Sequence, residues 1–104
     1  MIEINNTFQL SLIMPVFNAE KYLKDSIESI LNQTFKDFEF IIINDGSSDN
    51  TGNIIKSFSD PRIKYFTKTN SGLIETLNYG LKKCSYPIIM RMDADDIISS
   101  KKTE

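Results

Sequence analysis

Three carboxylates follow an apolar stretch near the end of this chain. Residues 88–90 have the length and character of a buried strand, and Asp93, Asp95 and Asp96 come soon after them. Carboxylates about 5 Å apart repel by roughly 3 kcal/mol at an effective dielectric near 20, a cost that water, a shared proton or a bound cation relieves. Oxygen ligands alone suit a hard ion such as Mg²⁺ or Mn²⁺ rather than zinc. The cluster is either a solvated acidic turn or a metal site.

The composition excludes several other kinds of chemistry. The chain has 104 residues, one cysteine and no histidine, which rules out a Ser-His or Cys-His pair, a His-based zinc site and an intrachain disulfide. A net charge of −2 argues against nucleic acid or an anionic membrane as a partner. Residues 1–9 are polar, without the pattern of a signal peptide or a membrane span, and the lone Cys84 fits a reducing compartment. We expect a single domain over residues 1–104, located in the cytoplasm.

Four short apolar runs predict the strands that position these acids. They cover residues 10–14, 38–43, 63–66 and 87–92. The second is rich in β-branched residues, which is typical of a central strand covered on both faces. Pro15 is expected to end the first strand and Pro87 to begin the last.

Helical patterns occupy the three intervals between these runs. Asn18 is expected to cap the first helix, which should end near residue 32 or 33, and Ser48 or Asp49 to cap the second. Residues 70–72 should open the third, with Gly80 packed closely against the sheet. The buried residues expected on these helices are Leu23, Ile27, Ile30, Leu31, Ile54, Ile55, Phe58, Leu73, Leu77, Leu81 and Cys84. The order βαβαβαβ predicts an α/β fold, a mainly parallel Rossmann-like sheet with helices on both faces.

The carboxyl ends of parallel strands meet at one edge of such a sheet, where ligands bind. Residues 15–18, 44–46, 68–72 and 93–96 should therefore converge, which brings Asp45 towards the C-terminal acids. The chain has no Gly-x-Gly-x-x-Gly fingerprint and no Walker loop, so glycine amides alone would not hold phosphates. A bridging cation would let carboxylates hold a diphosphate, and the convergence favours this site over a solvated turn.

Five motifs together resemble the nucleotide-binding half of the family-2 glycosyltransferases, which have the GT-A fold. The resemblance runs from residue 12 to residue 97 and depends on the order and spacing of the motifs. It implies transfer of a sugar, with inversion, from a nucleotide-diphosphate sugar (UDP-sugar favoured) to an acceptor hydroxyl in polysaccharide or glycoconjugate biosynthesis. The motifs are SLIMPVFN at 11–18 with Glu20 and Tyr22-Leu23, QTF at 33–35, NDGSSD at 44–49, Asn70 with Gly72-Leu73 and Asn78-Tyr79-Gly80, and MDADD at 92–96.

The resemblance also implies which residues meet the nucleotide. Pro15 and Phe17 would flank the base with Glu20 beside them, although a residue like Phe17 is as often packed at a strand end. Asp45 would accept a hydrogen bond from a uracil-type N3–H, the alternative being that it caps its own turn. The nucleotide would also contact Gly72 and Leu73.

At the other end of the donor, the resemblance implies a Mn²⁺ or Mg²⁺ ion. Asp93 would meet the ribose or the metal, and Asp95 would be the main metal ligand, with Asp96 competing for that role. The cation would offset charge on the diphosphate leaving group. No residue of this chain is assigned as the catalytic base.

The chain departs from the family pattern at three places. Leu77 stands where many members carry a basic residue. Arg91 precedes the acids, and its partner could be one of them, Glu75 or solvent. The chain stops at Glu104, so the acceptor-binding half and its general base are expected to be absent.

We therefore expect the isolated chain to bind donor without transferring sugar, and to form homodimers or aggregates through the open edge of its last strand. A non-catalytic nucleotide-sugar-binding module is the alternative. In a full-length protein the acceptor would be a glycan or a lipid-linked molecule, with the enzyme at the inner face of the membrane.

Overall fold

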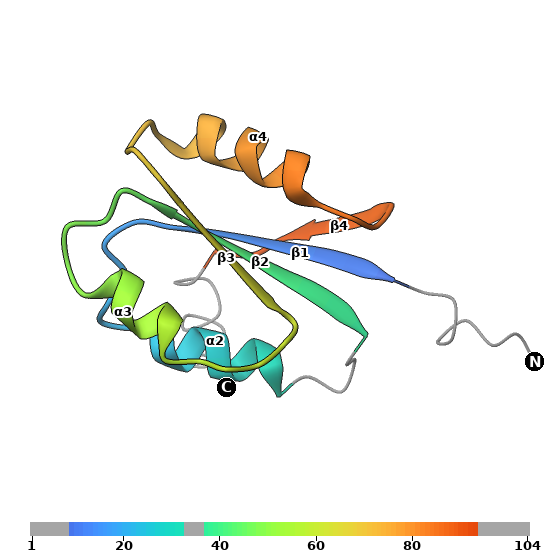
Figure 1. The fold of residues 1–104 in the computed structure, drawn as a ribbon, viewed down its shortest axis with the longest axis horizontal. Coiled ribbons are helices and arrows are strands. Elements are labelled where there is room, and N and C mark those ends of the chain that lie inside the picture. Colours follow the sequence, from blue (N-terminus) through green and yellow to red (C-terminus); the bar gives the residue numbers. More distant parts are fainter. Residues whose placement is uncertain (1–8, 33–36, 94–104) are drawn as a thin grey trace, which may run out of the picture.

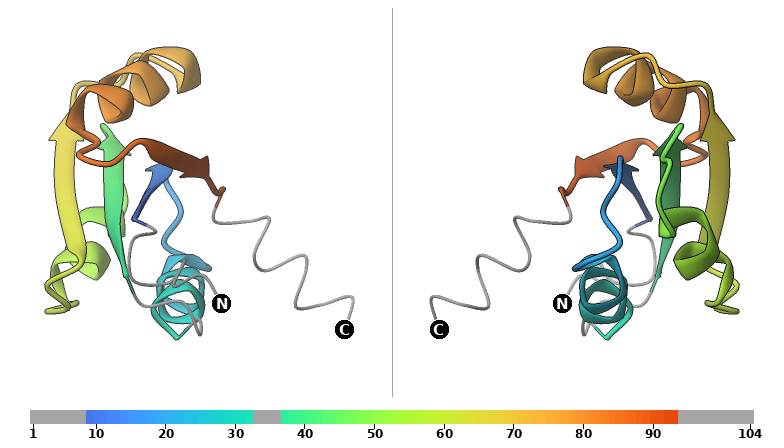
Figure 2. Two further views of the ribbon diagram at one scale, coloured as in Figure 1. Left: turned by 90° about the vertical axis from the view of Figure 1, so that its right-hand side faces the viewer. Right: turned by 90° about the vertical axis from the view of Figure 1, so that its left-hand side faces the viewer.

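A single parallel sheet with helices on both faces forms the framework (Figure 1). The computed structural model describes residues 9–32 and 37–93. The strands lie in the order β3-β2-β1-β4. Figure 2 shows α2 and α3 on one side of the sheet and α4 on the other, which confirms the predicted α/β architecture. The elements are β1 (Leu10–Val16), α2 (Leu23–Leu31), β2 (Phe38–Asp45), α3 (Thr51–Lys56), β3 (Ile63–Lys68), α4 (Leu73–Lys83) and β4 (Ile88–Arg91).

Strand β2 lies in the interior of the sheet, as its β-branched run predicts. It pairs in parallel with β1 and with β3, and all of its residues are buried. Successive side chains point to opposite faces. Phe40 and Ile42 join the core beneath α2 and α3, whereas Ile41 and Ile43 pack on the α4 side.

Strand β1 continues through Pro15, where the sequence predicts a break. The Ile13 carbonyl accepts a hydrogen bond from the Met92 N–H (3.0 Å), so the backbone hydrogen-bonding groups of Ile13 point towards β4. The backbone of Pro15, two residues further on, points to the same side. It lies beyond the last pair of residues in the β1–β4 register, Ile13 with Arg91. Its missing N–H therefore removes no hydrogen bond from the ladder.

Small residues of α4 lie closest to the sheet, and only part of the predicted apolar stripe packs there. Thr76 and Gly80 are its buried residues, while Leu73 and Leu81 are each 49% exposed. A Cβ at Gly80 would lie 2.7 Å from Ile43 Cδ1. The expected close approach at Gly80 is thus confirmed. Two residues of the predicted stripe, Leu77 and Cys84, are half-buried and pack against the core on this side of the sheet.

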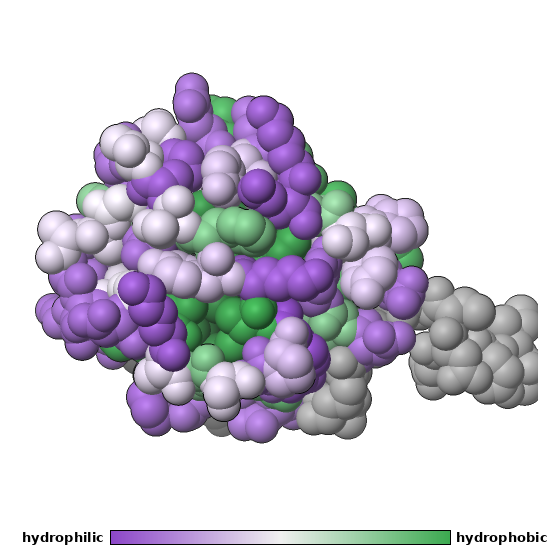
Figure 3. Space-filling model, viewed as in Figure 1, coloured by the Kyte–Doolittle hydropathy of each residue, from purple (hydrophilic) through white to green (hydrophobic). Residues whose placement is uncertain are grey.

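The surface seen in Figure 3 is hydrophilic around its rim, with hydrophobic residues showing near the centre, where β3 crosses. The residues of β3 are half-buried or exposed, because this strand forms one edge of the sheet. Within the described parts of the chain, none of the helices combines the length and the apolar character needed to cross a membrane.

Candidate functional site

Two adjoining hollows lie beyond the carboxyl ends of β1, β2 and β4, and we call them together the sheet-end groove. The first has a volume of about 390 Å³ and the second about 230 Å³, of the order found for small-molecule sites. The first is lined by Pro15, Val16, Phe17, Asp45, Asn70, Gly72, Leu73 and Thr76. The second is lined by Pro15, Val16, Phe17, Ala19, Tyr22, Leu73, Arg91 and Asp93.

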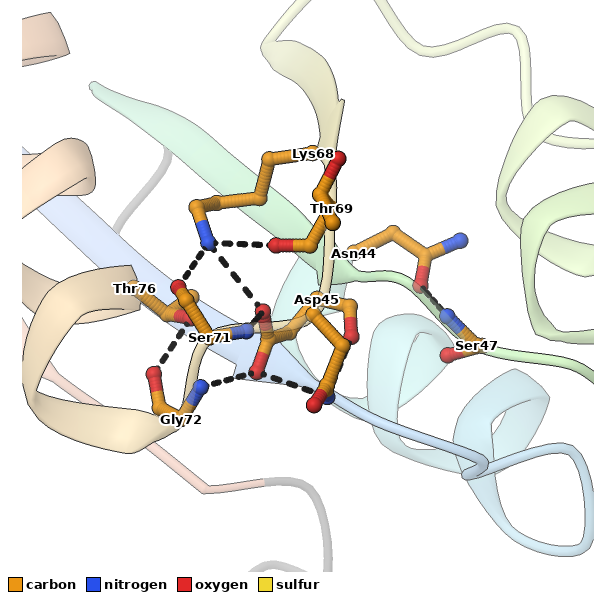
Figure 4. A network of polar contacts seen from close by, with 9 residues as sticks. Asn44, Asp45, Ser47, Lys68, Thr69, Ser71, Gly72 and Thr76 are labelled. Carbon is orange, nitrogen blue, oxygen red and sulfur yellow. Dashed lines mark hydrogen bonds and ion pairs between the residues drawn. The ribbon is translucent and has the colours of Figure 1, made fainter.

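Asp45, the last residue of β2, lines the first hollow and is the centre of a network of polar contacts (Figure 4). Its Oδ1 accepts hydrogen bonds from the Ser71 N–H (3.0 Å) and the Lys68 Nζ (3.2 Å). Its Oδ2 accepts from the Gly72 N–H (3.1 Å) and the Asn70 Nδ2 (3.3 Å). The carboxylate thus holds the residues that lead into α4.

Asp45 does not cap its own turn, which was the alternative role for it. The turn is capped by Asn44 instead, whose Oδ1 accepts a hydrogen bond from the Ser47 N–H at 3.0 Å. Gly46, in between, has a φ of 70° and approaches residue 70 so closely that a Cβ would lie 2.6 Å from the Asn70 nitrogen. The turn after β2 is therefore pressed against the segment that donates to Asp45.

The surroundings of Asp45 keep its carboxyl group ionised. Burial on its own raises the pKa, but hydrogen bonds from the Ser71 N–H, Lys68 and the Gly72 N–H outweigh burial and hold the pKa below its ordinary value. A carboxylate has about four acceptor sites, and the donors around Asp45 already occupy them. A ligand N–H would have to replace one donor. Lys68 is the donor that a ligand could replace, because its Nζ would keep its contacts with Ser71 Oγ and the Thr69 carbonyl.

The wall of the groove at Phe17 is supported by hydrogen bonds between the loops that follow β1 and β2. The Asn18 N–H donates to Ser47 Oγ (2.9 Å), and Asn18 Oδ1 accepts from the Ser48 N–H (2.9 Å). Asn18 adopts a left-handed conformation with φ 49°. It does not cap α2, contrary to the prediction, because the N-cap residue of that helix is Tyr22. Phe17 lines the groove and is 51% exposed.

Glu20 lies outside the groove, unlike the position that the resemblance implies for it. Its carboxylate accepts a hydrogen bond from the Asn50 N–H (2.7 Å), and its own N–H donates to Asp49 Oδ2 (3.3 Å). The carboxylate is drawn to the amides that open α3, where negative charge is favoured. Asp49 accepts from the Thr51 N–H (3.0 Å), but the N-cap residue of α3 is Asn50, later in the chain than the predicted Ser48 or Asp49.

Asp93 and Arg91 line the other end of the groove. Arg91 Nη2 contacts both carboxylate oxygens, at 3.2 and 3.1 Å, and Nε lies 3.3 Å from Oδ1. This identifies Asp93, rather than Glu75, as the partner of Arg91. Asp95 and Asp96 lie outside the described residues.

The donor chemistry at Asp93 fits the hard cation that the resemblance implies. Its two oxygens already hold a positively charged group, and its side chain is 34% exposed, so an ion can reach it. Among residues 9–32 and 37–93, no group of three or more His, Cys, Asp or Glu side chains gathers to hold a metal.

The groove gathers Pro15, Phe17, Asp45, Gly72, Leu73 and Asp93 from the residues proposed on sequence, and leaves out Glu20. Sequence reasoning included the segment 68–72 but gave no role to Lys68 or Asn70, and it missed Thr76. The spacing offers one signal, since Thr76 lies four residues after Gly72 and its hydroxyl donates to the Gly72 carbonyl at 2.8 Å.

A parallel sheet with a groove across the carboxyl ends of its strands defines an α/β domain of the doubly wound class. Residues 11–104 match the sequence profile described as Glycosyl transferase family 2. The chain belongs to glycosyltransferase family 2, and its fold is that of the GT-A enzymes.

Individual relatives share this part of the chain. The O-antigen biosynthesis glycosyltransferase WbnJ of Escherichia coli is 45% identical over 91 residues, which are 85% of this chain and 36% of WbnJ. S. aureus TarS 1-349 in complex with UDP-GlcNAc has a TM-score of 0.78 at 25% identity, covering 92% of this chain and 30% of that one.

A more distant neighbour shows the fold alone. The Pyrobaculum calidifontis mannosyltransferase PcManGT, in complex with GDP-Man and Mn²⁺, has a TM-score of 0.77 at 20% identity, covering 86% of this chain and 28% of that one. Among the curated relatives that it matches, this chain spans from 14% to 39% of their length.

Proposed function

We propose that this chain is the donor-binding part of a glycosyltransferase that takes a nucleotide-diphosphate sugar, with a UDP-sugar favoured. The observation that carries the proposal is the sheet-end groove, which runs from Asp45 past Phe17 to Asp93. One end offers an ionised acceptor, the middle an exposed aromatic ring, and the far end a carboxylate that already holds a cation. The acceptor and the ring suit a nucleotide base, and the far carboxylate suits a metal-bound diphosphate.

At the base end, Asp45 would accept the N3–H of a uracil, with Pro15 and Phe17 against the ring. Because the pKa of Asp45 lies below its ordinary value, the carboxylate accepts a hydrogen bond at neutral pH rather than donating one. A uracil N3–H is a donor, and it would replace the Lys68 Nζ at 3.2 Å. Gly72 and Leu73 would contact the nucleotide from the start of α4.

At the other end, Asp93 together with Asp95 and Asp96 would hold Mn²⁺ or Mg²⁺. An ion bound there would neutralise charge on the diphosphate leaving group. Carboxylate oxygens are the ligands that these ions prefer. The mannosyltransferase PcManGT has been solved in complex with both GDP-Man and Mn²⁺, which is consistent with a divalent ion in this fold.

The full-length protein would transfer the sugar with inversion to a glycan or lipid-linked acceptor, in polysaccharide or glycoconjugate biosynthesis. The name of WbnJ, an O-antigen biosynthesis enzyme, supports that pathway class. A non-catalytic nucleotide-sugar-binding module is the second candidate. It would bind donor equally well, so an assay of sugar transfer by the full-length protein separates the two.

Nuclear magnetic resonance tests the proposed site directly. Titration of UDP in the presence of Mg²⁺ should shift the backbone amides of Phe17, Ser71 and Gly72, while those of Ile30 on α2 should stay unchanged. The reason is that the first three lie at the groove or donate to Asp45. Shifts centred on α2 and α3, or no shifts at all, would contradict the proposal.

A further inference from the structure

One basic residue lines the sheet-end groove among its described residues, and it is already paired. Arg91 is the last residue of β4 and Asp93 follows two residues later, so a short segment presents both side chains to the second hollow. The guanidinium contacts both oxygens of the Asp93 carboxylate, at 3.1 to 3.3 Å. The oxygens that a metal ion would use are therefore covered by an internal cation.

The pair is placed so that it can open. The side chains of Arg91 and Asp93 are 43% and 34% exposed. Exposed ion pairs of this kind shift an equilibrium by about two- to fivefold at most. A divalent ion can compete with such an exposed partner, whereas it could not readily displace a buried one.

We propose that Arg91 is an exchangeable counter-ion: it neutralises Asp93 while the site is empty, gives way to the divalent ion, and then pairs with the diphosphate oxygens of the nucleotide. The proposal rests on the proposed donor site and adds to it a role for Arg91. Guanidinium groups bind phosphate and carboxylate oxygens in the same forked geometry. Arg91 thus keeps an anionic partner in both states.

The exchange couples metal binding to nucleotide binding. Without nucleotide, the ion must compete with Arg91 for Asp93, which weakens its binding. With nucleotide present, the displaced guanidinium gains a new anion, so the ion binds more tightly. By linkage, the ion must strengthen nucleotide binding by the same factor. Loss of the guanidinium should raise metal affinity in the empty site and reduce the coupling.

Electron paramagnetic resonance of free Mn²⁺ measures both effects. Mn²⁺ is titrated into the wild type, Arg91→Gln and Arg91→Lys, first alone and then with saturating UDP. We expect Arg91→Gln to bind Mn²⁺ alone about two- to fivefold more tightly than the wild type. We expect UDP to tighten Mn²⁺ binding by a smaller factor in Arg91→Gln than in the wild type, with Arg91→Lys in between.

Lys24→Gln is the matched control, because it removes the same charge from an exposed pair with Glu28 on α2, away from the groove. It should behave as the wild type, and thermal unfolding should show that all variants are folded.

Unchanged or weaker binding of Mn²⁺ alone by Arg91→Gln would overturn the proposal, as would absence of Mn²⁺ binding without UDP in every variant. Equal coupling in Arg91→Gln and the wild type would also overturn it while leaving the donor site intact. Failure of the wild type to bind UDP would overturn both.

Discussion

Glu39 and Asp45 are buried carboxylates on the same strand, and only one of them faces the groove. Asp45 lines the first hollow at the carboxyl end of β2. Glu39, near the other end, accepts hydrogen bonds from Ser11 Oγ (2.5 Å), the Lys64 Nζ (2.8 Å) and the Ser85 N–H (2.6 Å). The neighbours of each carboxylate keep it ionised, so the two can be compared directly. Asp45 is proposed to bind a ligand, whereas Glu39 stabilises the fold.

The first prediction uses this pair. Asp45→Asn should weaken UDP binding by about ten- to a hundredfold, because a hydrogen bond to a charged acceptor is worth about 1.5–3 kcal/mol. The dependence of binding on Mn²⁺ should remain, since Asp45 is assigned to the base. Titration calorimetry measures both quantities on protein that circular dichroism shows to be folded.

Glu39→Gln is the control for that experiment. It should lower the free energy of unfolding while leaving UDP affinity unchanged, because Glu39 lies outside the residues that line the two hollows. Equal loss of UDP affinity in both variants would mean that Asp45 acts only through stability. Normal binding by Asp45→Asn would show that its carboxylate does no more than hold the start of α4.

At the scale of elements, Glu39 ties β2 to its neighbours. Its three partners come from β1, β3 and the connection between α4 and β4. Burial alone raises the pKa of the Glu39 carboxyl, but hydrogen bonds from Lys64, Ser11 and the Ser85 N–H outweigh it and lower the pKa. Because the pKa is lower in the folded protein, Glu39 stabilises the fold above the pKa of the unfolded chain. This contribution is lost as the pH falls through the folded pKa.

The second prediction follows from that sign. The free energy of unfolding of the wild type, measured by urea denaturation, should fall as the pH drops below about 4.3, the ordinary pKa of a glutamate. Glu39→Gln should be less stable at pH 7 by about 1–3 kcal/mol, because a buried acceptor network is broken. Its stability should fall less steeply at low pH. Glu28→Gln, which breaks an exposed pair, should follow the wild type, and the same slope in Glu39→Gln would contradict the assignment.

The sequence predicts the elements well where side chains repeat regularly. The β-branched run of β2 predicts its buried, interior position, and the alternation of strands and helices predicts the layers. Helix α4 was harder to predict, because the sheet selects small residues there: Thr76 and Gly80 are buried, while the more hydrophobic Leu73 and Leu81 are half-exposed. Hydrophobic periodicity does not detect a face made of small residues.

The candidate site could be predicted as a set of segments but not as a set of contacts. The parallel direction of the strands alone brings Asp45 and Asp93 to the same end of the sheet, beyond the carboxyl ends of its strands. The partners of Glu20, in contrast, lie 29 and 30 residues away in another loop. No local pattern shows that this carboxylate turns towards the Asn50 N–H rather than the groove.

At the scale of the whole molecule, the two edges of the sheet differ in character. Edge strand β3 carries Lys64 and Lys68, which discourage pairing with another sheet. On edge strand β4, Ile88, Ile89 and Met90 are 39%, 41% and 48% exposed. A second copy of the chain could pair with β4 and cover these side chains.

The third prediction is self-association through β4. Sedimentation equilibrium should show dimers or larger species whose share rises with protein concentration. Ile89→Lys should weaken association by about tenfold or more, since it places a charge in the apolar contact. Ile74→Lys, at a 75% exposed position on α4, is the control and should associate as the wild type does. A monomer at every concentration, or equal effects of both variants, would rule out the β4 edge.

The fourth prediction tests the central claim, that the groove between Asp45 and Asp93 is a metal-assisted site for a nucleotide diphosphate. The measurement is the affinity of the wild-type chain for UDP by titration calorimetry, with Mn²⁺ in one series and EDTA in the other. We predict that UDP binds in both series and about tenfold or more tightly with Mn²⁺, because the ion bridges the carboxylates and the diphosphate. Equal affinity with and without the metal, or no binding of UDP in either series, would contradict this account.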